Sequence, residues 1–363
     1  MKRTCRVVLF CALAGYLGAT TIAQGPGGAG GQRGDDRPIN DVPNPYRTIE
    51  HALKMPEGRT WGSTSAVAID KDGRSVWVAE RCGANSCLPS PDVDTILKFD
   101  GSGTLVKSFG AGLLIFPHGI FVDRDGNIWV TDGQDNAPRP QRGAAPAPPS
   151  PTPPPDTPIG PRPGATKGSQ VYKFSPDGKI LMTLGKPGGA AEPDYFYQPN
   201  AVLVAPNGDI FIAEGHGGGN NRLFKFSKEG TLIKVWGKKG TGEGEFNLPH
   251  VVCLDAKGKV YVGDRENNRV QVFDADGKFL VQWKESGAPY GLFLTPDRAL
   301  VADGRANQVR VLDRDGKPLG RWGEKGTEAG QFTMPHWVCV DSRGVVYVAE
   351  VNGQRVQKFV AKP

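Results

Sequence analysis

Residues 250–283, HVVCLDAKGKVYVGDRENNRVQVFDADGKFLVQW, contain four short runs of apolar or alternating residues separated by polar segments. Two of the connections, DAKG and DADG, end in glycine, which readily adopts the positive φ that tight hairpin turns need. Short runs rich in Val, Tyr and Phe that lie between such turns are typical of β-strands. The stretch therefore predicts one four-stranded antiparallel sheet.

The same pattern recurs six times along the chain. Clear copies begin with HGIFVDRDGNIWVTD at 118–132, NAVLVAPNGDIFIAEG at 200–215 and YGLFLTPDRALVADG at 290–304. A period of roughly forty to fifty residues with four strands in each unit is typical of a β-propeller, whose blades bury their faces against one another. We predict an all-β fold, a six-bladed β-propeller with four-stranded blades.

The last copy is one strand short. HWVCVDSRGVVYVAEVNGQRVQKF at 336–359 supplies three strands, and only VAKP follows it. An open sheet edge would invite aggregation, so we expect a strand near the N-terminus, within YRTIEHAL at 46–53, to complete the sheet and close the ring.

The N-terminal residues have the features of an export signal. Basic residues at positions 2, 3 and 6 precede an apolar run that ends in small residues at Ala23. We predict a signal peptide over 1–23, a flexible Gly-rich lead over 24–44 and the propeller over 45–363, with a disordered Pro/Ala-rich insert at about 137–168. An uncleaved N-terminal anchor is the alternative. The signal predicts a secreted or periplasmic protein with no membrane span after cleavage.

The net charge bears on the class of partner, and the positions of the cysteines bear on which of them form a disulfide. The formal net charge of +6 includes three positive charges of the predicted signal, so the mature chain would carry 6 − 3 = +3. This small excess does not favour nucleic acid as a partner. Cys82 and Cys87 lie in the polar stretch RCGANSCLP and are expected to form a small disulfide loop, whereas Cys253 and Cys339 are expected to be reduced and buried in strands.

Three of the five histidines occupy one context, a Pro-His pair before an apolar run. Alignment of the copies gives one position at the start of each innermost strand, here named the axial column: Ser65, His118, Asn200, His250, Tyr290 and His336. Alternate blades of a six-fold ring lie about 120° apart, so the three imidazoles should converge on the axis. Three histidines with an open fourth position suit a catalytic zinc ion. The alternative is that each Pro-His only forms a strand-entry turn, with the imidazole bonded to backbone.

A second position recurs at the end of the second strand of each copy and is always acidic. We name these side chains the six acids and expect them to make a repeated structural hydrogen bond: Glu80, Asp132, Glu214, Asp264, Asp303 and Glu350. Because neighbouring strands are antiparallel, the residues that follow the acids share a rim with the axial column. Arg81, His216 and Arg265 should lie there, and arginine favours an anionic substrate. Pairing of Arg265 with Glu266 is the alternative.

These residues resemble those of the peptidyl-α-hydroxyglycine α-amidating lyases, which carry NHL-type repeats. The stretches FPHGIFVDRDGNIWVTD (116–132), LPHVV (248–252), DRENNRVQVF (264–273) and MPH (334–336) carry the resemblance most specifically. It implies zinc bound by His118, His250 and His336, with Arg81 and Arg265 as catalytic residues.

Two positions depart from the family pattern. His216, in EGHGGG, stands where the family has its catalytic tyrosine, and Trp337 stands where the family has an acid that binds calcium. His216 is therefore a candidate general base, with Tyr290 as a second candidate. A calcium site is doubtful.

The resemblance implies a zinc-dependent lyase that cleaves a carbinolamide to an amide and glyoxylate. Its substrate would be a small molecule or a peptide C-terminus that carries a carboxylate, and we expect a monomer. Two alternatives stay open: a zinc-dependent hydrolase of an ester, lactone or amide at the same site, and a non-catalytic NHL scaffold.

Overall fold

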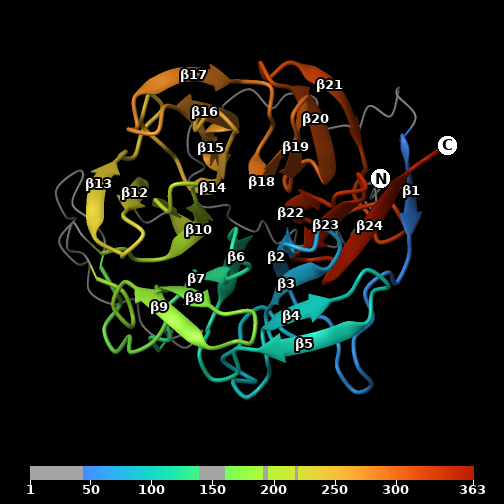
Figure 1. The fold of residues 1–363 in the computed structure, drawn as a ribbon, viewed down its shortest axis with the longest axis horizontal. Coiled ribbons are helices and arrows are strands. Elements are labelled where there is room, and N and C mark those ends of the chain that lie inside the picture. Colours follow the sequence, from blue (N-terminus) through green and yellow to red (C-terminus); the bar gives the residue numbers. More distant parts are fainter. Residues whose placement is uncertain (1–43, 139–159, 191–194, 217–219) are drawn as a thin grey trace, which may run out of the picture. The chain divides into compact units, whose positions relative to one another are not determined.

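Six four-stranded antiparallel sheets surround a common axis in the computed structural model, which confirms the predicted six-bladed β-propeller (Figure 1). The model describes residues 44–138, 160–190, 195–216 and 220–363. The predicted signal peptide, nearly all of the predicted lead and residues 139–159 of the predicted insert lie outside the described residues. The described residues all fall within one compact unit, Arg37–Pro363.

Each blade has the same strand order from the axis outward, and the strands fall into four sets. The innermost strands are β2 (Thr64–Ile69), β6 (Pro117–Val122), β10 (Pro199–Val204), β14 (Pro249–Leu254), β18 (Pro289–Leu294) and β22 (Pro335–Val340). The second strands are β3 (Val76–Glu80), β7 (Ile128–Asp132), β11 (Ile210–Glu214), β15 (Val260–Asp264), β19 (Arg298–Asp303) and β23 (Val346–Glu350).

The two outer sets complete the sheets. The third strands are β4 (Ile96–Phe99), β8 (Val171–Phe174), β12 (Arg222–Phe226), β16 (Arg269–Phe273), β20 (Gln308–Asp313) and β24 (Arg355–Ala361). The outermost strands are β5 (Leu105–Phe109), β9 (Ile180–Leu184), β13 (Leu232–Trp236), β17 (Phe279–Trp283), β21 (Pro318–Trp322) and β1 (Tyr46–Ile49). The described residues contain no α-helix, and a single-turn 3-10 helix, η2, spans Arg265–Asn267. No helix in the described part of the chain is long and apolar enough to span a bilayer.

The ring closes as the sequence predicts, because β1 pairs antiparallel with β24 in the last blade. Tyr46 lies opposite Ala361 in this pairing, and its ring packs 4.7 Å from that of Trp322 in the preceding blade. One blade therefore combines the first described strand with the last, and the outer edge of β24 is covered.

Tight turns connect strands at the end of the ring remote from the axial column. In the DRDG turn of blade two, Gly126 has a φ of 87°, and Asp123 accepts the indole N–H of Trp129 at 3.0 Å. Asp70 accepts the indole N–H of Trp77 in the same way at 2.7 Å in blade one. These acids fix their turns through buried tryptophans, and the repeated turn keeps the blades alike.

The C-terminal end of the predicted insert is described and is bonded to the residues that precede it. Arg162 pairs with the buried carboxylate of Asp135, which also accepts the hydroxyl of Tyr197 at 2.6 Å. Asn136 accepts the main-chain N–H of Thr166 at 2.8 Å. Residues 160–168 are thus held against blade two by hydrogen bonds and an ion pair.

Closure by β1 predicts a measurable loss of stability when its aromatic side chain is removed. Tyr46→Ala removes the contact with Trp322 and should lower the free energy of unfolding by about 2 kcal/mol. Arg47→Ala, at the neighbouring exposed position, should change it by less than about 0.5 kcal/mol. Denaturant unfolding of both variants checks this, and equal stability of the two would contradict closure through β1.

Candidate metal centre

The axial column forms a belt of hydrogen bonds that runs from blade to blade. Each of five side chains bonds to a backbone carbonyl of the next innermost strand: Ser65 to Pro117 (2.8 Å), His118 to Asn200 (2.8 Å), Asn200 to Pro249 (2.7 Å), His250 to Tyr290 (2.6 Å) and His336 to Ser65 (2.6 Å). At the remaining junction, between blades five and six, the ring of Tyr290 packs 5.7 Å from that of His336. The belt therefore fixes the direction in which each column side chain leaves its strand.

The three histidines of the belt converge on the axis. One ring nitrogen of His118, one of His250 and one of His336 lie within 4.8 Å of one another. The ring centroids are 4.8–4.9 Å apart, and all three side chains are buried. Repeat spacing alone predicted this convergence, although nothing in the local sequence around any one histidine has metal-binding spacing.

The hydrogen bonds of the belt leave one nitrogen of each imidazole available. In each ring Nδ1 lies against a carbonyl oxygen, so Nδ1 carries the proton and Nε2 keeps its lone pair. Nε2 of His118 and Nε2 of His250 are buried and have no hydrogen-bond partner in the described part of the chain. Burial holds the pKa of all three imidazoles well below the usual value, which keeps them neutral.

These features suit a divalent metal ion that prefers nitrogen ligands. Neutral imidazoles oriented by a carbonyl bond at the other ring nitrogen are the usual arrangement around zinc. Without a ligand, buried lone pairs that accept no hydrogen bond carry an energetic cost. The backbone bond that the alternative interpretation expects is present at each of the three histidines, and it engages only Nδ1 of the ring.

The six acids hold the loops that lead into the axial column. In five blades the carboxylate accepts the main-chain N–H three residues before the column position: Gly62, Ile115, Tyr197, Asn247 and Thr333. In the fifth blade Asp303 instead accepts the N–H of Ala306 at 3.1 Å. The expected structural role is therefore observed, and it fixes where the innermost strand begins.

Asp132 differs from the other acids. Each of the other five forms an ion pair with an arginine, whereas Asp132 forms none with the described residues. Among the described residues, its buried carboxylate accepts N–H groups only from Ile115 and Phe116. Burial raises its pKa to about 7, although these two bonds and the charge of Arg81 oppose the rise.

Arg81 lies at the metal end of the ring without a carboxylate partner among the described residues. Its side chain is 2% exposed, its guanidinium carbon lies 3.4 Å from the ring centre of Phe116, and its N–H groups bond to Pro117 and Asn85. Burial lowers its pKa to about 9, against the charges of Asp132 and Glu80. A buried guanidinium with spare donors is a ready partner for a carboxylate.

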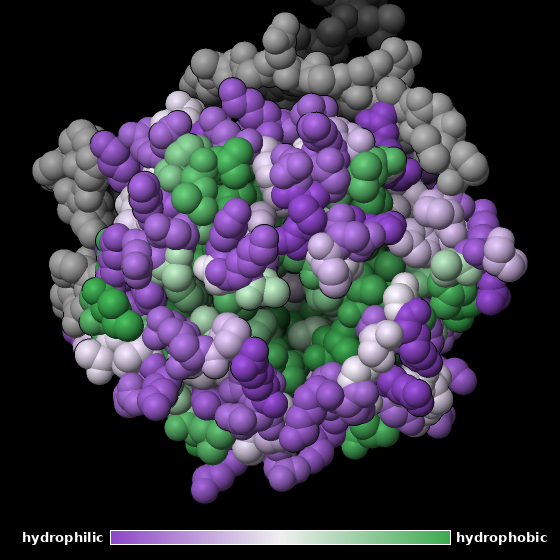
Figure 2. All heavy atoms as spheres, turned by 45° about the horizontal axis from the view of Figure 1, so that its top comes forward, coloured by the Kyte–Doolittle hydropathy of each residue, from purple (hydrophilic) through white to green (hydrophobic). Residues whose placement is uncertain are grey.

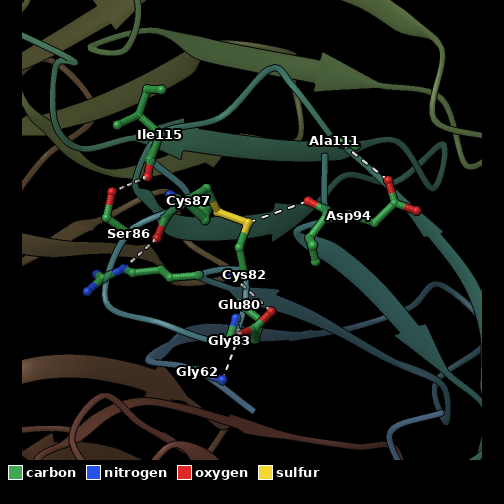
Figure 3. The surroundings of a disulfide bond; sticks show 12 residues. Gly62, Glu80, Cys82, Gly83, Ser86, Cys87, Asp94, Ala111 and Ile115 are labelled. Carbon is green, nitrogen blue, oxygen red and sulfur yellow. Dashed lines mark hydrogen bonds between the residues drawn. A yellow bond between two sulfur atoms is a disulfide. The ribbon is translucent and has the colours of Figure 1, made fainter. Parts of the chain in front are cut away.

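The disulfide predicted between Cys82 and Cys87 is present and shapes the loop beside Arg81 (Figure 3). The main-chain N–H of Cys87 donates to Ile115 at 2.9 Å, and Glu80 accepts the N–H groups of Cys82 and Gly83. The loop therefore bridges blades one and two, and it includes Asn85, which orients Arg81. Of the two other cysteines in the described residues, Cys339 is buried as expected, whereas Cys253 is only half-buried.

His216 adds a fourth imidazole to the site. Its ring centroid lies 4.9 Å from that of His118 and 5.5 Å from that of Phe116. Its Nδ1 is buried and has no hydrogen-bond partner among the described residues. Burial, with Arg81 and Arg265 nearby, lowers its pKa to about 3, so the ring is neutral. It is not one of the three residues whose nitrogens gather within 4.8 Å.

Arg265 and Tyr290 contact each other beside His250. The Arg265 guanidinium carbon lies 4.5 Å from the ring centre of Tyr290, whose ring is 5.3 Å from that of His250. Arg265 also pairs with Glu266 at 2.9 Å, and Glu266 pairs with the exposed Arg305. The alternative partner predicted for Arg265 is therefore present, and the charge of Arg265 also contributes, after burial, to the lowered pKa of His250.

The position of the family's calcium-binding acid does not suit calcium here. Trp337 fills it with a largely buried indole, which offers no oxygen ligand. Phe116, Asn85 and the pairing of Glu266 with Arg305 were missed at the sequence level. The repeat alignment contained a signal only for Phe116, which lies two positions before a column histidine.

Comparisons with known proteins agree with the repeat architecture. The NHL repeat model matches residues 246–273 and 332–359. Human NHL repeat-containing protein 3 is 32% identical over 331 residues, which cover 87% of this chain and 84% of the human protein. The chain belongs to the NHL-repeat family.

Other relatives of this NHL-repeat protein are named as enzymes. A probable peptidyl-α-hydroxyglycine α-amidating lyase of Caenorhabditis elegans is 30% identical over 233 residues, 59% of this chain and 56% of that protein. Among solved structures, a streptogramin B lyase has a similar fold, with a TM-score of 0.53. The match covers 87% of this chain and 98% of the lyase chain at 16% identity, so it supports the fold alone. The resemblance to amidating lyases predicted from sequence is therefore confirmed.

The centre predicts a stoichiometric metal ion. The purified NHL-repeat protein should bind about one zinc per chain, and His250→Ala should lose most of it, because one of three ligands disappears. His51→Ala, which changes the exposed histidine after β1, is the matched control and should keep the metal. Elemental analysis after dialysis checks this, and equal zinc in all three proteins, or none in any, would contradict the assignment.

Proposed function

We propose that this NHL-repeat protein is a zinc-dependent lyase that cleaves peptidyl-α-hydroxyglycine-like carbinolamides to an amide and glyoxylate. The observation that carries the proposal is the convergence of three neutral imidazoles next to two arginines on one rim. The named amidating lyases among its relatives support the reaction class.

His118, His250 and His336 would hold the zinc through Nε2, and the belt keeps these nitrogens in place through the carbonyl bonds of Nδ1. When bound, zinc would supply Lewis-acid chemistry that makes a substrate hydroxyl more acidic. The buried surroundings of the three rings would exclude bulk water from the reacting atoms.

Arg81 and Arg265 would bind and orient the carboxylate of the substrate. Arg81 is buried and has donors free of carboxylate, so a substrate carboxylate would satisfy it. Arg265 is tied to Glu266 and packs on Tyr290, which restricts its guanidinium to the side of His250. The two guanidinium charges, one on each side of the substrate, would hold the carbon that bears the hydroxyl in one position.

His216 would move the proton. Its neutral ring would accept the hydroxyl proton at the buried, unpartnered Nδ1. The hydroxyl oxygen then forms the carbonyl of glyoxylate while the C–N bond breaks and its electron pair stays on nitrogen. Transfer of the same proton from His216 to that nitrogen completes the amide, so no co-reactant is consumed.

We also propose that the protein works outside the cytoplasm, secreted or in a periplasm. The disulfide between Cys82 and Cys87 supports an oxidising compartment. The natural substrate would be a small molecule or a peptide C-terminus with a free carboxylate.

Two other functions remain as outcomes of the test. Replacement of the family's tyrosine by His216 favours a hydrolase that uses the same metal on an ester, lactone or amide. Similarity to NHL repeat-containing protein 3 over most of the chain favours a scaffold with no catalysis.

The lyase proposal predicts glyoxylate release from an N-acyl-α-hydroxyglycine by the zinc-loaded protein. His216→Phe removes the proton acceptor and should lower kcat by about 10²- to 10⁴-fold with little change in bound zinc. His51→Phe makes the same substitution at an exposed histidine and should leave kcat unchanged. Ester hydrolysis without glyoxylate release would favour the hydrolase, and inactivity of the zinc-loaded protein towards both substrates would favour the scaffold.

Arg81 predicts a separate effect on substrate binding. Arg81→Met keeps much of the stem that packs on Phe116 but removes the donors, so KM for the carboxylate substrate should rise about tenfold or more. The corresponding substrate amide, which lacks the negative charge, should distinguish wild type from Arg81→Met far less. An equal loss with both substrates would contradict a carboxylate contact.

A further inference from the structure

A cavity lies on the axis, at the end remote from the three histidines. Its volume is about 280 Å³, and it is lined by the later residues of all six innermost strands. Every lining residue is apolar, including Leu203, Leu254 and Phe293. Figure 2 shows a hollow in one face of the propeller with hydrophobic residues inside and mostly hydrophilic residues around it.

Close-packed backbone separates this cavity from the metal centre. Gly119 and Gly291 follow the column positions of blades two and five, and a β-carbon there would meet backbone atoms of the neighbouring strand at 2.6 Å and 2.7 Å. Trp337 holds the same position in blade six and lines the cavity. The cavity lining starts at Ile120, two residues of extended chain after His118, which is about 7 Å. None of the three histidines lines the cavity.

Two cations lie where the apolar cavity meets the turns. An adjoining depression shares Ile69 and Leu254 with the cavity and includes Lys71 and Arg124. Both are exposed, and the Lys71 chain crosses to the turn of blade two, where its ammonium donates to the carbonyl of Asp125 at 3.1 Å. The mouth of the cavity thus carries two exposed cations on the side of blades one and two.

Neither cation is neutralised by the described carboxylates. The two acids that line the same depression have other partners: Asp123 accepts N–H groups of Trp129 and Asn127, and Asp255 accepts the hydroxyl of Tyr261. No described carboxylate lies within ion-pair distance of Lys71 or Arg124. Free cations beside an apolar cavity suit a ligand with an anionic head and an apolar body.

We propose that this cavity binds a medium-chain aliphatic carboxylate, with the chain among the apolar strand residues and the carboxylate at Lys71 and Arg124. Apolar cavities take apolar groups in preference to water. The volume is close to the lower end, about 300 Å³, of small-molecule pockets, so the ligand must be small. The site is independent of the proposed lyase activity.

Calorimetric titration with octanoate tests the proposal on the zinc-loaded protein. Octanoate should bind at one site, and octanol, which has the same chain length without the charge, should bind about tenfold more weakly or worse. The double variant K71M/R124M changes only exposed side chains and should weaken octanoate binding by about tenfold while leaving octanol unchanged. Equal affinity of both ligands for both proteins would overturn the carboxylate contact.

The location needs its own variant, because Arg81 and Arg265 at the other end could also attract a carboxylate. Leu254→Trp fills the cavity and should abolish octanoate binding, whereas Leu319→Trp, on the exposed face of β21, should not. Thermal unfolding and zinc content of both variants report whether each is folded. Octanoate binding that survives in a folded Leu254→Trp protein, or no octanoate binding by the wild type, would overturn the proposed site; if Leu254→Trp does not fold, the K71M/R124M result decides.

Discussion

Around the axis of the propeller, a side chain of one innermost strand donates a hydrogen bond to the backbone of the next. Five of the six junctions between blades carry such a bond, and the sixth is filled by Tyr290 packed on His336. Because a buried carbonyl needs a partner, each bond constrains both blades that it joins. The geometry of the metal centre follows from this belt, since three of its donors are imidazoles.

An imidazole suits this position because its two nitrogens point in different directions. Nδ1 satisfies the carbonyl of the next blade, and Nε2 is then directed elsewhere with its lone pair free. Serine and asparagine fill the same role at Ser65 and Asn200 but leave no comparable ligand. One structural rule, applied around a ring, thus brings together three imidazoles that could hold a metal ion, without any local motif.

The sequence predicted the parts of this protein that repeat. The strands, the turns, closure by β1 and the axial column all follow from the spacing of the repeats, because every blade packs against its neighbours in the same way. The contacts that occur once could not be read in this way. The stacking of Arg81 on Phe116, the bond from Arg81 to Asn85 and the missing arginine partner of Asp132 depend on how two particular blades meet. The place of His216 on the rim follows from the repeat, its candidate role as a base follows from its departure from the family pattern, and its contact with His118 comes from the structure.

The two ends of the axis carry different kinds of side chain, and the repeat makes this difference the same in every blade. At one end the strands begin with polar column residues and long irregular loops, and at the other they end in apolar residues and tight turns. Close backbone packing at Gly119 and Gly291 keeps the two environments apart. A polar end that carries the column histidines and an apolar cavity therefore occupy one ring.

The central claim is that Nε2 of His118, His250 and His336 share one metal ion on the axis. Anomalous diffraction at the zinc edge from crystals of the zinc-loaded protein tests this most directly. The account predicts a single anomalous peak with all three Nε2 atoms about 2.0–2.1 Å away and each Nδ1 still on its carbonyl. A zinc peak away from the axis, or coordination through Nδ1 with the belt broken, would contradict it.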